Sequence, residues 1–282
     1  ALLGLTPVLV DVDPNSFNID PKAIERAITP KTKAIVPVHL FGQVADMDAI
    51  MVIAEKHNLY VIEDNAQGIG ATHTDANGNT IKTGGIGHVG STSFFPSKNL
   101  GCYGDGGAIF TNDDDLAHTL RGIVNHGMYE RYHHDVVGVN SRLDSLQAVV
   151  LNEKLKLLDY YNERRKWAAI RYSQLLSDHD NIITPEVIRN CDSHVFHQYT
   201  LRLIASDRDA LVQHLQNKGI PCGVYYPIPL HAQKAYQSHK YEEANFAVTN
   251  QLVKEVISLP MHSELDEDQI QTICRAVLDF LG

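Results

Sequence analysis

The sequence predicts an α/β fold with a mainly parallel sheet, helices on both faces of that sheet, and a small α+β domain after it. In the first part of the chain, apolar runs of strand length alternate with segments of helical periodicity, which is typical of βαβ units. A long helical pattern then covers residues 143–176, and a mixed order of strands and helices follows it. We therefore expect a large domain over residues 1–165 and a small domain over residues 166–282, joined by that helix.

The first part of the chain contains five expected strands, which are residues 7–12, 33–38, 60–63, 91–95 and 107–111. The pair Asp20-Pro21 is typical of a helix N-terminus, and Asp46 can cap a second helix that runs to about residue 57. The glycine-rich residues 71–90 indicate turns or a hairpin. The run Asp113–Asp115 predicts a short helix with acidic residues in its first turn.

The small domain is expected to begin with a strand over residues 196–204. Ser206 can cap the next helix, because an acidic residue follows it three positions later. Another β-prone stretch lies near Val224, and further helices are expected from about Glu242 and from Asp266.

Composition excludes several functional classes. The chain has 282 residues, 44% of them hydrophobic, and a formal net charge of −10, which argues against a nonspecific nucleic-acid binder. No apolar run has the length of a membrane helix, and residues 1–7 lack the basic flank of a signal peptide, so we expect a cytoplasmic protein. The cysteines show no Cys-x-x-Cys spacing and His133-His134 lacks further ligands, so no metal site is expected.

Two chemically reactive side chains follow expected strands. Lys98 comes after residues 91–95 and precedes a glycine-rich loop, and Asp64 follows residues 60–63. Ligands of open α/β sheets bind beyond the carboxyl ends of the strands. Pyridoxal phosphate requires an amine for its Schiff base and an anion beside its pyridine nitrogen, and Lys98 and Asp64 would supply one each. Taken singly, each also fits a solvated lysine or a turn-forming aspartate.

The order of these motifs is more specific than either residue. A strand followed by Asp-x-x-Gln, a glycine-rich loop, Ser-x-x-x-x-Lys and a Gly-Gly-strand resembles the nucleotide-sugar aminotransferases of the DegT type, which are fold-type I pyridoxal-phosphate enzymes. The resemblance extends through residues 7–13, 140–144 and 225–231. It covers nearly the whole chain. The large domain is accordingly expected to have the fold of a fold-type I aminotransferase.

The resemblance implies roles for four residues around the cofactor. Lys98 would form the Schiff base and, once the amino donor displaces it, transfer a proton. Asp64 would hold the pyridinium. Gln67 would lie near the phenolic oxygen of the cofactor, although a glutamine after a strand can equally anchor a loop. Ser93 would donate a hydrogen bond from its hydroxyl to the phosphate. The alternative is that Ser93 is an ordinary strand residue with no role in binding.

Five further residues match family positions nearer the substrate or the partner subunit. Asn140 matches an asparagine that reaches the phosphate of the cofactor in a second subunit, which implies a homodimer with shared active sites. Arg142 would either support Asn140 structurally or contact the substrate beside it. The alternative is that Arg142 forms only a surface salt bridge. Tyr225, Tyr226 and His231 match the segment that faces the sugar, although loop aromatics also simply pack a small domain.

The resemblance implies an aminotransferase that moves an amino group from L-glutamate to a keto carbon of a nucleotide-linked sugar. Residues 92–114 are most similar to those of enzymes acting on UDP-linked 3-keto uronic acids, and a 4-keto hexose is the alternative substrate. Such products serve polysaccharide biosynthesis, including that of lipopolysaccharide. A sister class that carries out dehydration has histidine at the position of Lys98, and the lysine weighs against that class.

Two departures from the family pattern are visible in the sequence. Family members have a segment ahead of the point where this chain begins, with a Gly-Thr or Gly-Ser turn that binds phosphate, and no such turn is present here. We therefore expect an N-terminally shortened version of a longer protein; the rival is a non-catalytic homologue with a regulatory or scaffolding role. In addition, Asn65 stands where small residues such as alanine are usual.

Overall fold

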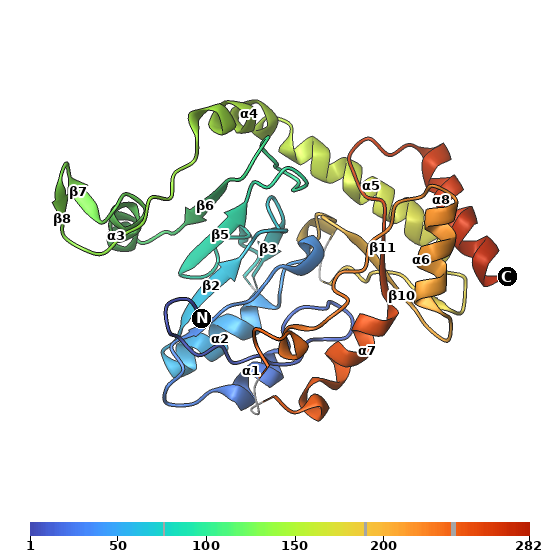
Figure 1. The fold of residues 1–282 in the computed structure, drawn as a ribbon, viewed down its shortest axis with the longest axis horizontal. Helices are drawn as coiled ribbons and strands as arrows, with labels where there is room; N and C mark the ends of the chain where they lie inside the picture. The colour runs from blue at the N-terminus through green and yellow to red at the C-terminus, as the bar shows by residue number, and fades with distance from the viewer. Residues whose placement is uncertain (76, 189–190, 238–240) are drawn as a thin grey trace.

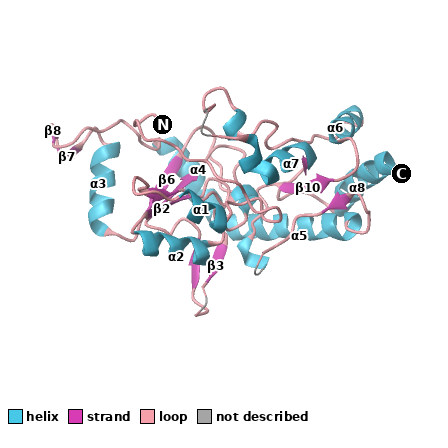
Figure 2. Ribbon diagram, turned by 90° about the horizontal axis from the view of Figure 1, so that it is seen from below, coloured by secondary structure: helices cyan, strands magenta, loops and turns pink. Residues whose placement is uncertain are grey.

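The computed structural model describes residues 1–75, 77–188, 191–237 and 241–282. The molecule is elongated. A two-stranded ribbon of β7 (Met128–Glu130) and β8 (His133–His134) lies at one end (Figure 1). Helices α6 (Arg208–Asn217) and α8 (Glu267–Leu281) lie at the other end, and Figure 2 shows the same separation from below.

The central sheet has the strand order β1-β2-β5-β6. Strands β1 (Ala34–Ile35), β2 (Tyr60–Asp64) and β5 (Val89–Ser93) are parallel, and β6 (Gly107–Phe110) is antiparallel to β5. The mainly parallel sheet that the sequence predicts is therefore confirmed. It places the ends of β2 and β5 beside each other, as the position of a site beyond these strands requires.

Helices α1 (Pro21–Ala27) and α2 (Met47–His57) pack beside this sheet. Asp20 caps α1 by accepting a hydrogen bond from the backbone of Lys22, and Asp46 caps α2 in the same way through Ala49. Both N-termini lie where the sequence predicts them. The buried residues of α2 form one apolar cluster with Val61 of β2, so burial of this helix face fixes β2 in the core.

Two more expectations from the first half of the chain are confirmed. The glycine-rich segment forms a hairpin of β3 (Thr72–Thr74) and β4 (Thr80–Lys82) that is separate from the central sheet. Helix α3 (Asp114–Val124) begins after Asp113, whose carboxylate accepts a hydrogen bond from the backbone of Leu116.

The expected strand over residues 7–12 is wrong. Only Val12 makes a β-bridge, with Ile19, and the rest of the segment pairs with no strand in the described part of the chain. The β-prone sequence lacks a neighbouring strand, and Asp11 instead contacts α7 (Ala247–Glu255). The strand expected over residues 33–38 is shorter than predicted, because Pro37 has no N–H with which to continue the ladder.

The single long helix predicted over residues 143–176 is also wrong. The structure contains α4 (Ser145–Leu155) and α5 (Leu158–Leu176), which a turn at Lys156 and Leu157 separates, and Figure 1 shows the change of direction. The apolar spacing runs on through the turn, so the sequence pattern conceals it. With this turn, both Leu151 and Leu158 join the apolar cluster that also contains Phe94.

In the last part of the chain, β10 (Tyr199–Leu203) pairs antiparallel with β9 (Ile182–Ile183) and with β11 (Val256–Leu259), a strand that the sequence analysis missed. Near Val224 there is only a bridge between Gly223 and Ser258. The helix expected from Glu242 is a 3-10 turn over Glu243–Phe246 followed by α7. The helix expected from Asp266 is confirmed as α8.

Ser206 does not cap α6. The cap is Asp207, whose carboxylate accepts a hydrogen bond from the backbone of Ala210 at 2.9 Å. The hydroxyl of Ser206 instead accepts a hydrogen bond from the side chain of Asn181. Aspartate and serine are comparable caps, so the local sequence could not decide between these neighbours.

No helix among the described residues is both long enough and apolar enough to span a membrane. No group of three or more His, Cys, Asp or Glu side chains in the same part of the chain is arranged to hold a metal ion.

Candidate active site

A pocket of about 440 Å³ lies beyond the ends of β2 and β5. Five of the residues that line it are predicted site residues, namely Gln67, Ser93, Lys98, Tyr225 and Tyr226. The structure thus brings together side chains that are as much as 159 positions apart. The other lining residues are Phe95, Ser97, Asp105, Gly106, His197 and Gln198.

Lys98 lies in a tight loop that follows β5. Its backbone N–H donates to the carbonyl of Phe95 at 2.9 Å, and Cys102 bonds back to Phe94. Gly101 permits this close turn, because a Cβ atom there would lie 2.4 Å from the carbonyl oxygen of Pro96. The loop therefore holds the lysine half-buried at the pocket wall.

Burial lowers the pKa of Lys98 below its ordinary value, and the negative charge of Asp64 partly opposes this shift. Burial disfavours the ammonium, which loses hydration, while a nearby carboxylate favours it. A lowered pKa increases the fraction of neutral amine at a given pH. This is the protonation state in which an amine attacks a carbonyl or accepts a proton.

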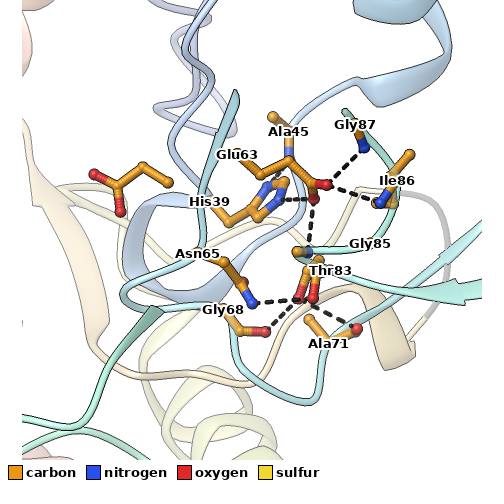
Figure 3. A network of polar contacts seen from close by, with 12 residues as sticks. His39, Ala45, Glu63, Asn65, Gly68, Ala71, Thr83, Gly85, Ile86 and Gly87 are labelled. Carbon is orange, nitrogen blue, oxygen red and sulfur yellow. Dashed lines mark hydrogen bonds and ion pairs between the residues drawn. The ribbon is translucent and has the colours of Figure 1, made fainter. Parts of the chain in front are cut away.

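Asp64 ends β2, and its neighbour Glu63 holds that strand end in place. Glu63 is fully buried and binds His39 at 2.8 Å (Figure 3). The ring of His39 accepts a hydrogen bond at Nδ1 from the backbone of Ala45, so its Nε2 carries the hydrogen that Glu63 accepts. The carboxylate of Glu63 also accepts three backbone N–H bonds of 2.7–2.8 Å, from Gly84, Ile86 and Gly87.

These donors decide the charge of Glu63. Burial alone would raise its pKa, but the hydrogen bonds from His39 and the loop backbone lower it below the ordinary value. Glu63 is therefore an anion with four donors, which is the condition for a stable buried carboxylate. Its bonds tie the end of β2 to residues 84–87.

Asn65 makes a second attachment to the same loop. Its side chain donates to the carbonyl of Thr83 at 3.0 Å, and the hydroxyl of Thr83 donates to the carbonyl of Gly68 at 2.7 Å (Figure 3). Successive side chains along an extended strand point to opposite faces, so the side chains of Glu63 and Asn65 point to the face opposite that of Asp64. Glu63 and Asn65 are thus both anchored to this loop. The carboxylate of Asp64 accepts a hydrogen bond from the backbone of Ala66 at 3.1 Å, and its charge acts on Lys98. The asparagine that departs from the family pattern thus has a structural role.

The carboxamide of Gln67 has a fixed orientation. Its Oε1 accepts a hydrogen bond of 2.5 Å from the backbone of Phe41, a buried residue with a positive φ of 58°. Its Nε2 lies 3.4 Å from the hydroxyl of Tyr226. Because the oxygen is occupied by a backbone donor, the NH₂ group is the part of Gln67 that is available to the pocket. Gln67 thus anchors a loop and also presents a donor.

Ser93 is the last residue of β5. Its hydroxyl oxygen accepts a hydrogen bond of 3.2 Å from the backbone of Phe95. The hydroxyl hydrogen is still available to a ligand, because a serine oxygen can accept and donate at the same time. Ser93 can therefore offer one donor to an anion in the pocket.

Four predicted site residues are absent from the pocket lining. One of them, Asp64, still lies near enough to Lys98 for its charge to act on the pKa of the lysine. The other three are Asn140, Arg142 and His231. Asn140 is exposed and forms a β-bridge with Asn125, and Arg142 is also exposed. His231 stacks on Phe246 with ring centroids 4.0 Å apart and contacts Asn250 at 3.0 Å. Within one chain the structure does not bring these three residues to Lys98, and their roles stay predictions.

His197 and Gln198 are pocket residues that the sequence analysis missed. They lie just before β10, about a hundred positions after Lys98. No motif marks them. The sequence feature that could have indicated them is that two polar residues directly precede an apolar strand. Other histidines occur in the same segment, so this feature does not single out His197.

Comparison with known proteins agrees with this geometry. Residues 1–278 match the model of the DegT/DnrJ/EryC1/StrS aminotransferase family. Relatives include a pleiotropic regulatory protein of Geobacillus stearothermophilus, 48% identical over 99% of this chain and 74% of the relative. A UDP-2-acetamido-2-deoxy-3-oxo-D-glucuronate aminotransferase of Pseudomonas aeruginosa is also 48% identical, over 98% of this chain and 74% of the relative. A UDP-N-acetyl-3-dehydro-α-D-glucosamine 3-aminotransferase of Acidithiobacillus ferrooxidans is 47% identical, over 98% and 72%.

Solved structures give the same result. A DegT DnrJ EryC1 StrS aminotransferase from Brucella abortus superposes with a TM-score of 0.93 at 41% identity, over all of this chain and 75% of that one. NtdA of Bacillus subtilis, solved with its cofactor PMP, superposes with a TM-score of 0.86 at 31% identity, over 97% and 62%. Both the sequence match and the fold lead to one conclusion: the chain belongs to the DegT/DnrJ/EryC1/StrS aminotransferase family.

Proposed function

We propose that the protein is a pyridoxal-phosphate-dependent aminotransferase that moves an amino group from L-glutamate to the keto carbon of a nucleotide-linked sugar. The observation that carries this proposal is the pairing of Lys98, whose pKa burial lowers, with Asp64 at the ends of neighbouring strands. The names of two relatives favour carbon 3 of a UDP-linked sugar as the acceptor, either a uronic acid or a glucosamine. A 4-keto hexose is the alternative acceptor.

The side chains that line the pocket, together with Asp64 near Lys98, fit pyridoxal 5'-phosphate. The cofactor has an aldehyde, a ring nitrogen, a phenolic oxygen and a phosphate, and the site offers an amine, a carboxylate, an amide N–H and a hydroxyl. Lys98, Asp64, Gln67 and Ser93 would hold these four groups in that order. When bound, the cofactor supplies an electron sink and carries the amino group between the two substrates.

The chain's own residues would supply proton transfer and charge. Lys98 would accept a proton from the substrate carbon as a neutral amine and return it later, acting as a general base and acid. Asp64 would keep the ring nitrogen protonated, since a fixed anion favours the charged form. The NH₂ of Gln67 would donate to the phenolic oxygen, and the hydroxyl of Ser93 to the phosphate.

A homodimer with shared active sites would complete this pocket. Large apolar side chains are exposed along the segment that carries Asn140: Val137 is 97% exposed, Leu146 80% and Val149 63%. Exposed apolar patches of this kind are typical of protein interfaces. The β7–β8 ribbon of the same region lies at one end of the molecule (Figure 1). Asn140 would reach the phosphate bound in the partner subunit.

The sugar would bind at the open side of the pocket. Tyr225 and Tyr226 already line it, and Arg142 and His231 are the further candidates. A nucleotide-sugar substrate accords with a cytoplasmic location and with a role in polysaccharide or lipopolysaccharide biosynthesis.

A regulatory role is the second candidate function. It is favoured by the relative from G. stearothermophilus, whose name describes a pleiotropic regulatory protein. A purely regulatory homologue would have no need of a lysine beside a carboxylate in a pocket. The catalytic proposal therefore explains more of the site.

An assay of the two half-reactions separates the candidates. The purified chain, supplied with pyridoxal phosphate, should convert L-glutamate to 2-oxoglutarate. It should then aminate UDP-2-acetamido-3-keto sugars, which mass spectrometry of the nucleotide sugar would detect. A TDP-linked 4-keto-6-deoxyhexose serves as the competing acceptor, and L-aspartate as the competing donor. No amino sugar from any acceptor, in a folded protein that binds the cofactor, would favour the regulatory role.

A further inference from the structure

His197 is a buried histidine that has no role in the proposed function. Its side chain lines the same pocket as Lys98, although only 6% of the residue is exposed. A buried polar group normally has hydrogen-bond partners that define its state. The partners of His197 determine which of its two ring nitrogens carries hydrogen.

The orientation of the Asn162 side chain, on α5, determines the hydrogen bonds of its neighbours. Its Nδ2 donates to the backbone carbonyl of Ile69 at 3.1 Å, and a carbonyl can only accept. This fixes the orientation of the amide, so Oδ1 of Asn162 is the acceptor that receives Nδ2 of Asn99 at 2.8 Å. Nδ2 of Asn99 also donates to the carbonyl of Val195 at 3.0 Å. Two backbone carbonyls therefore fix both amides.

The orientation of Asn99 then fixes His197. With both hydrogens of the Asn99 amide in use, its Oδ1 is left as an acceptor, 3.3 Å from Nδ1 of His197. Two acceptors cannot form a hydrogen bond, so Nδ1 of His197 must carry the hydrogen. Asn99 directly follows Lys98 in the sequence, and this network thus connects the lysine loop to α5 and to the segment before β10.

The remaining ring nitrogen, Nε2, has no hydrogen. The ring is neutral, because burial, reinforced by the positive charges of Lys98 and Arg165, lowers the pKa of His197 to about 3. Arg165 itself donates to the backbone carbonyl of His197 at 3.2 Å. No protein group among the described residues forms a hydrogen bond with Nε2. A neutral imidazole protonated at Nδ1 presents an acceptor at Nε2.

We propose that His197 is a positioning residue for Lys98: its Nε2, which has no hydrogen-bond partner among the described residues, would accept a hydrogen bond from the ε-amino group when the lysine side chain turns toward it within the pocket. This bond would direct the flexible side chain toward the place where the lysine reacts. The inference deepens the proposed function, because it matters to catalysis only if Lys98 is the reactive lysine. The hydrogen bond itself can be tested without any transamination.

The first test determines the state of the ring in the full-length chain. Nitrogen-15 NMR of the protein labelled at histidine distinguishes Nδ1–H, Nε2–H and imidazolium rings, and the signal that is lost in His197→Asn identifies His197 among the 15 histidines. We expect the Nδ1–H form throughout the neutral pH range. An Nε2–H ring or an imidazolium at pH 7 would overturn the proposal.

The second test measures the amino group. The chain is freed of aldehyde cofactor with hydroxylamine, and acetylation of Lys98 by acetic anhydride is followed by mass spectrometry against exposed Lys31. A neutral acceptor stabilises an ammonium more than an amine, so its loss should lower the pKa of Lys98. At pH 8, His197→Asn should raise the relative acetylation rate of Lys98 roughly threefold.

A matched pair of variants isolates the acceptor. Asparagine can still donate to Asn99 but has no atom at the position of Nε2, whereas glutamine in His197→Gln can place an oxygen there. The glutamine variant should therefore acetylate at nearly the wild-type rate. Equal rates in all three folded proteins would show that His197 only fills space. If borohydride does not attach the cofactor to Lys98 but the acetylation rates follow this pattern, the proposed function fails and the contact stands.

Discussion

At the scale of single residues, the proposed function divides the chemistry between Lys98 as a base and Asp64 as a fixed charge. Burial lowers the pKa of the lysine and the carboxylate partly restores it, so the two groups act on each other before any ligand binds. In the proposed function Asp64 has a second role, which is to keep the ring nitrogen of the cofactor protonated. An amide of the same shape would fill the space without the charge.

We therefore predict that Asp64→Asn binds pyridoxal phosphate but reacts slowly with L-glutamate. The half-reaction, followed by the change in cofactor absorbance, should slow by roughly 100-fold or more. Asp178→Asn, at an exposed position, is the control. An unchanged half-reaction rate would mean that Asp64 is a structural turn residue.

The sequence predicts these two residues as site residues because each follows a strand that an apolar pattern identifies. It also led to Ser93 and Gln67 through fixed spacings in the same motif. It did not reveal the buried pair His39 and Glu63, because their partnership depends on backbone N–H groups of a loop. Backbone donors have no signature in the sequence.

At the scale of elements, two predictions were wrong because tertiary contacts, which the local sequence does not contain, decide the structure. Residues 7–12 have a strand-like composition, but a strand needs a neighbour, and among the described residues only Ile19 pairs with this segment, at Val12. The break between α4 and α5 leaves the apolar spacing intact, so tertiary packing and not local preference decides it. The N-termini of α1, α2, α3 and α8 were predicted correctly, because a capping side chain bonds within its own turn, whereas the cap of α6 was placed one residue too early.

Asp11 shows how such a segment can still be important. Its carboxylate accepts hydrogen bonds from the backbone of Val248 and from the backbone and hydroxyl of Thr249, at 2.6–3.0 Å. It thereby caps α7 with a residue 236 positions before it. Burial raises the pKa of Asp11, but these hydrogen bonds outweigh it and lower the pKa below the ordinary 3.8.

We predict that Asp11→Ala lowers the free energy of unfolding by about 1 kcal/mol at pH 7, as loss of a helix cap does. Because the folded-state pKa is lowered, this contribution is fully present above pH 3.8 and disappears as the pH falls through the folded value. Urea unfolding of wild type, Asp11→Ala and the exposed control Asp178→Ala, from pH 7 down to the acid limit of folding, tests this. A difference that persists unchanged in acid would contradict it.

At the scale of the whole molecule, the chain has separate apolar cores. We propose that residues 1–165 and 166–282 are two domains, with α5 shared between them. Its first residue, Leu158, packs in the cluster around Phe94, whereas Tyr172 and Leu176 belong to the cluster around β10 and α8. The pocket includes residues from both parts, so the relative position of the two parts affects the site.

If the proposed homodimer shares its active sites, Asn140 contributes to cofactor binding in the partner subunit. Asn140→Ala should weaken cofactor binding about 10- to 100-fold, since one hydrogen bond to a charged phosphate is worth about 1.5 to 3 kcal/mol. Lys98→Ala should be inactive. In a heterodimer of the two variants, both defects lie in one site and the other site is intact. Mixing equal amounts should therefore restore about one quarter of the wild-type activity.

Subunit exchange has to be verified for this experiment, for example by mass spectrometry of intact dimers with differently tagged chains. Without recovery in a verified heterodimer, Asn140 does not act across the interface. A monomer in solution at all concentrations would exclude shared sites altogether.

The most direct test of the central claim is to identify the residue that binds the cofactor. The protein is incubated with pyridoxal phosphate, reduced with borohydride and digested, and the modified peptide is located by mass spectrometry. We predict one pyridoxyl group per chain, on Lys98, together with loss of the visible absorbance band, and no modification in folded Lys98→Ala. A pyridoxyl group on another lysine, or none in protein that remains folded, would contradict the account.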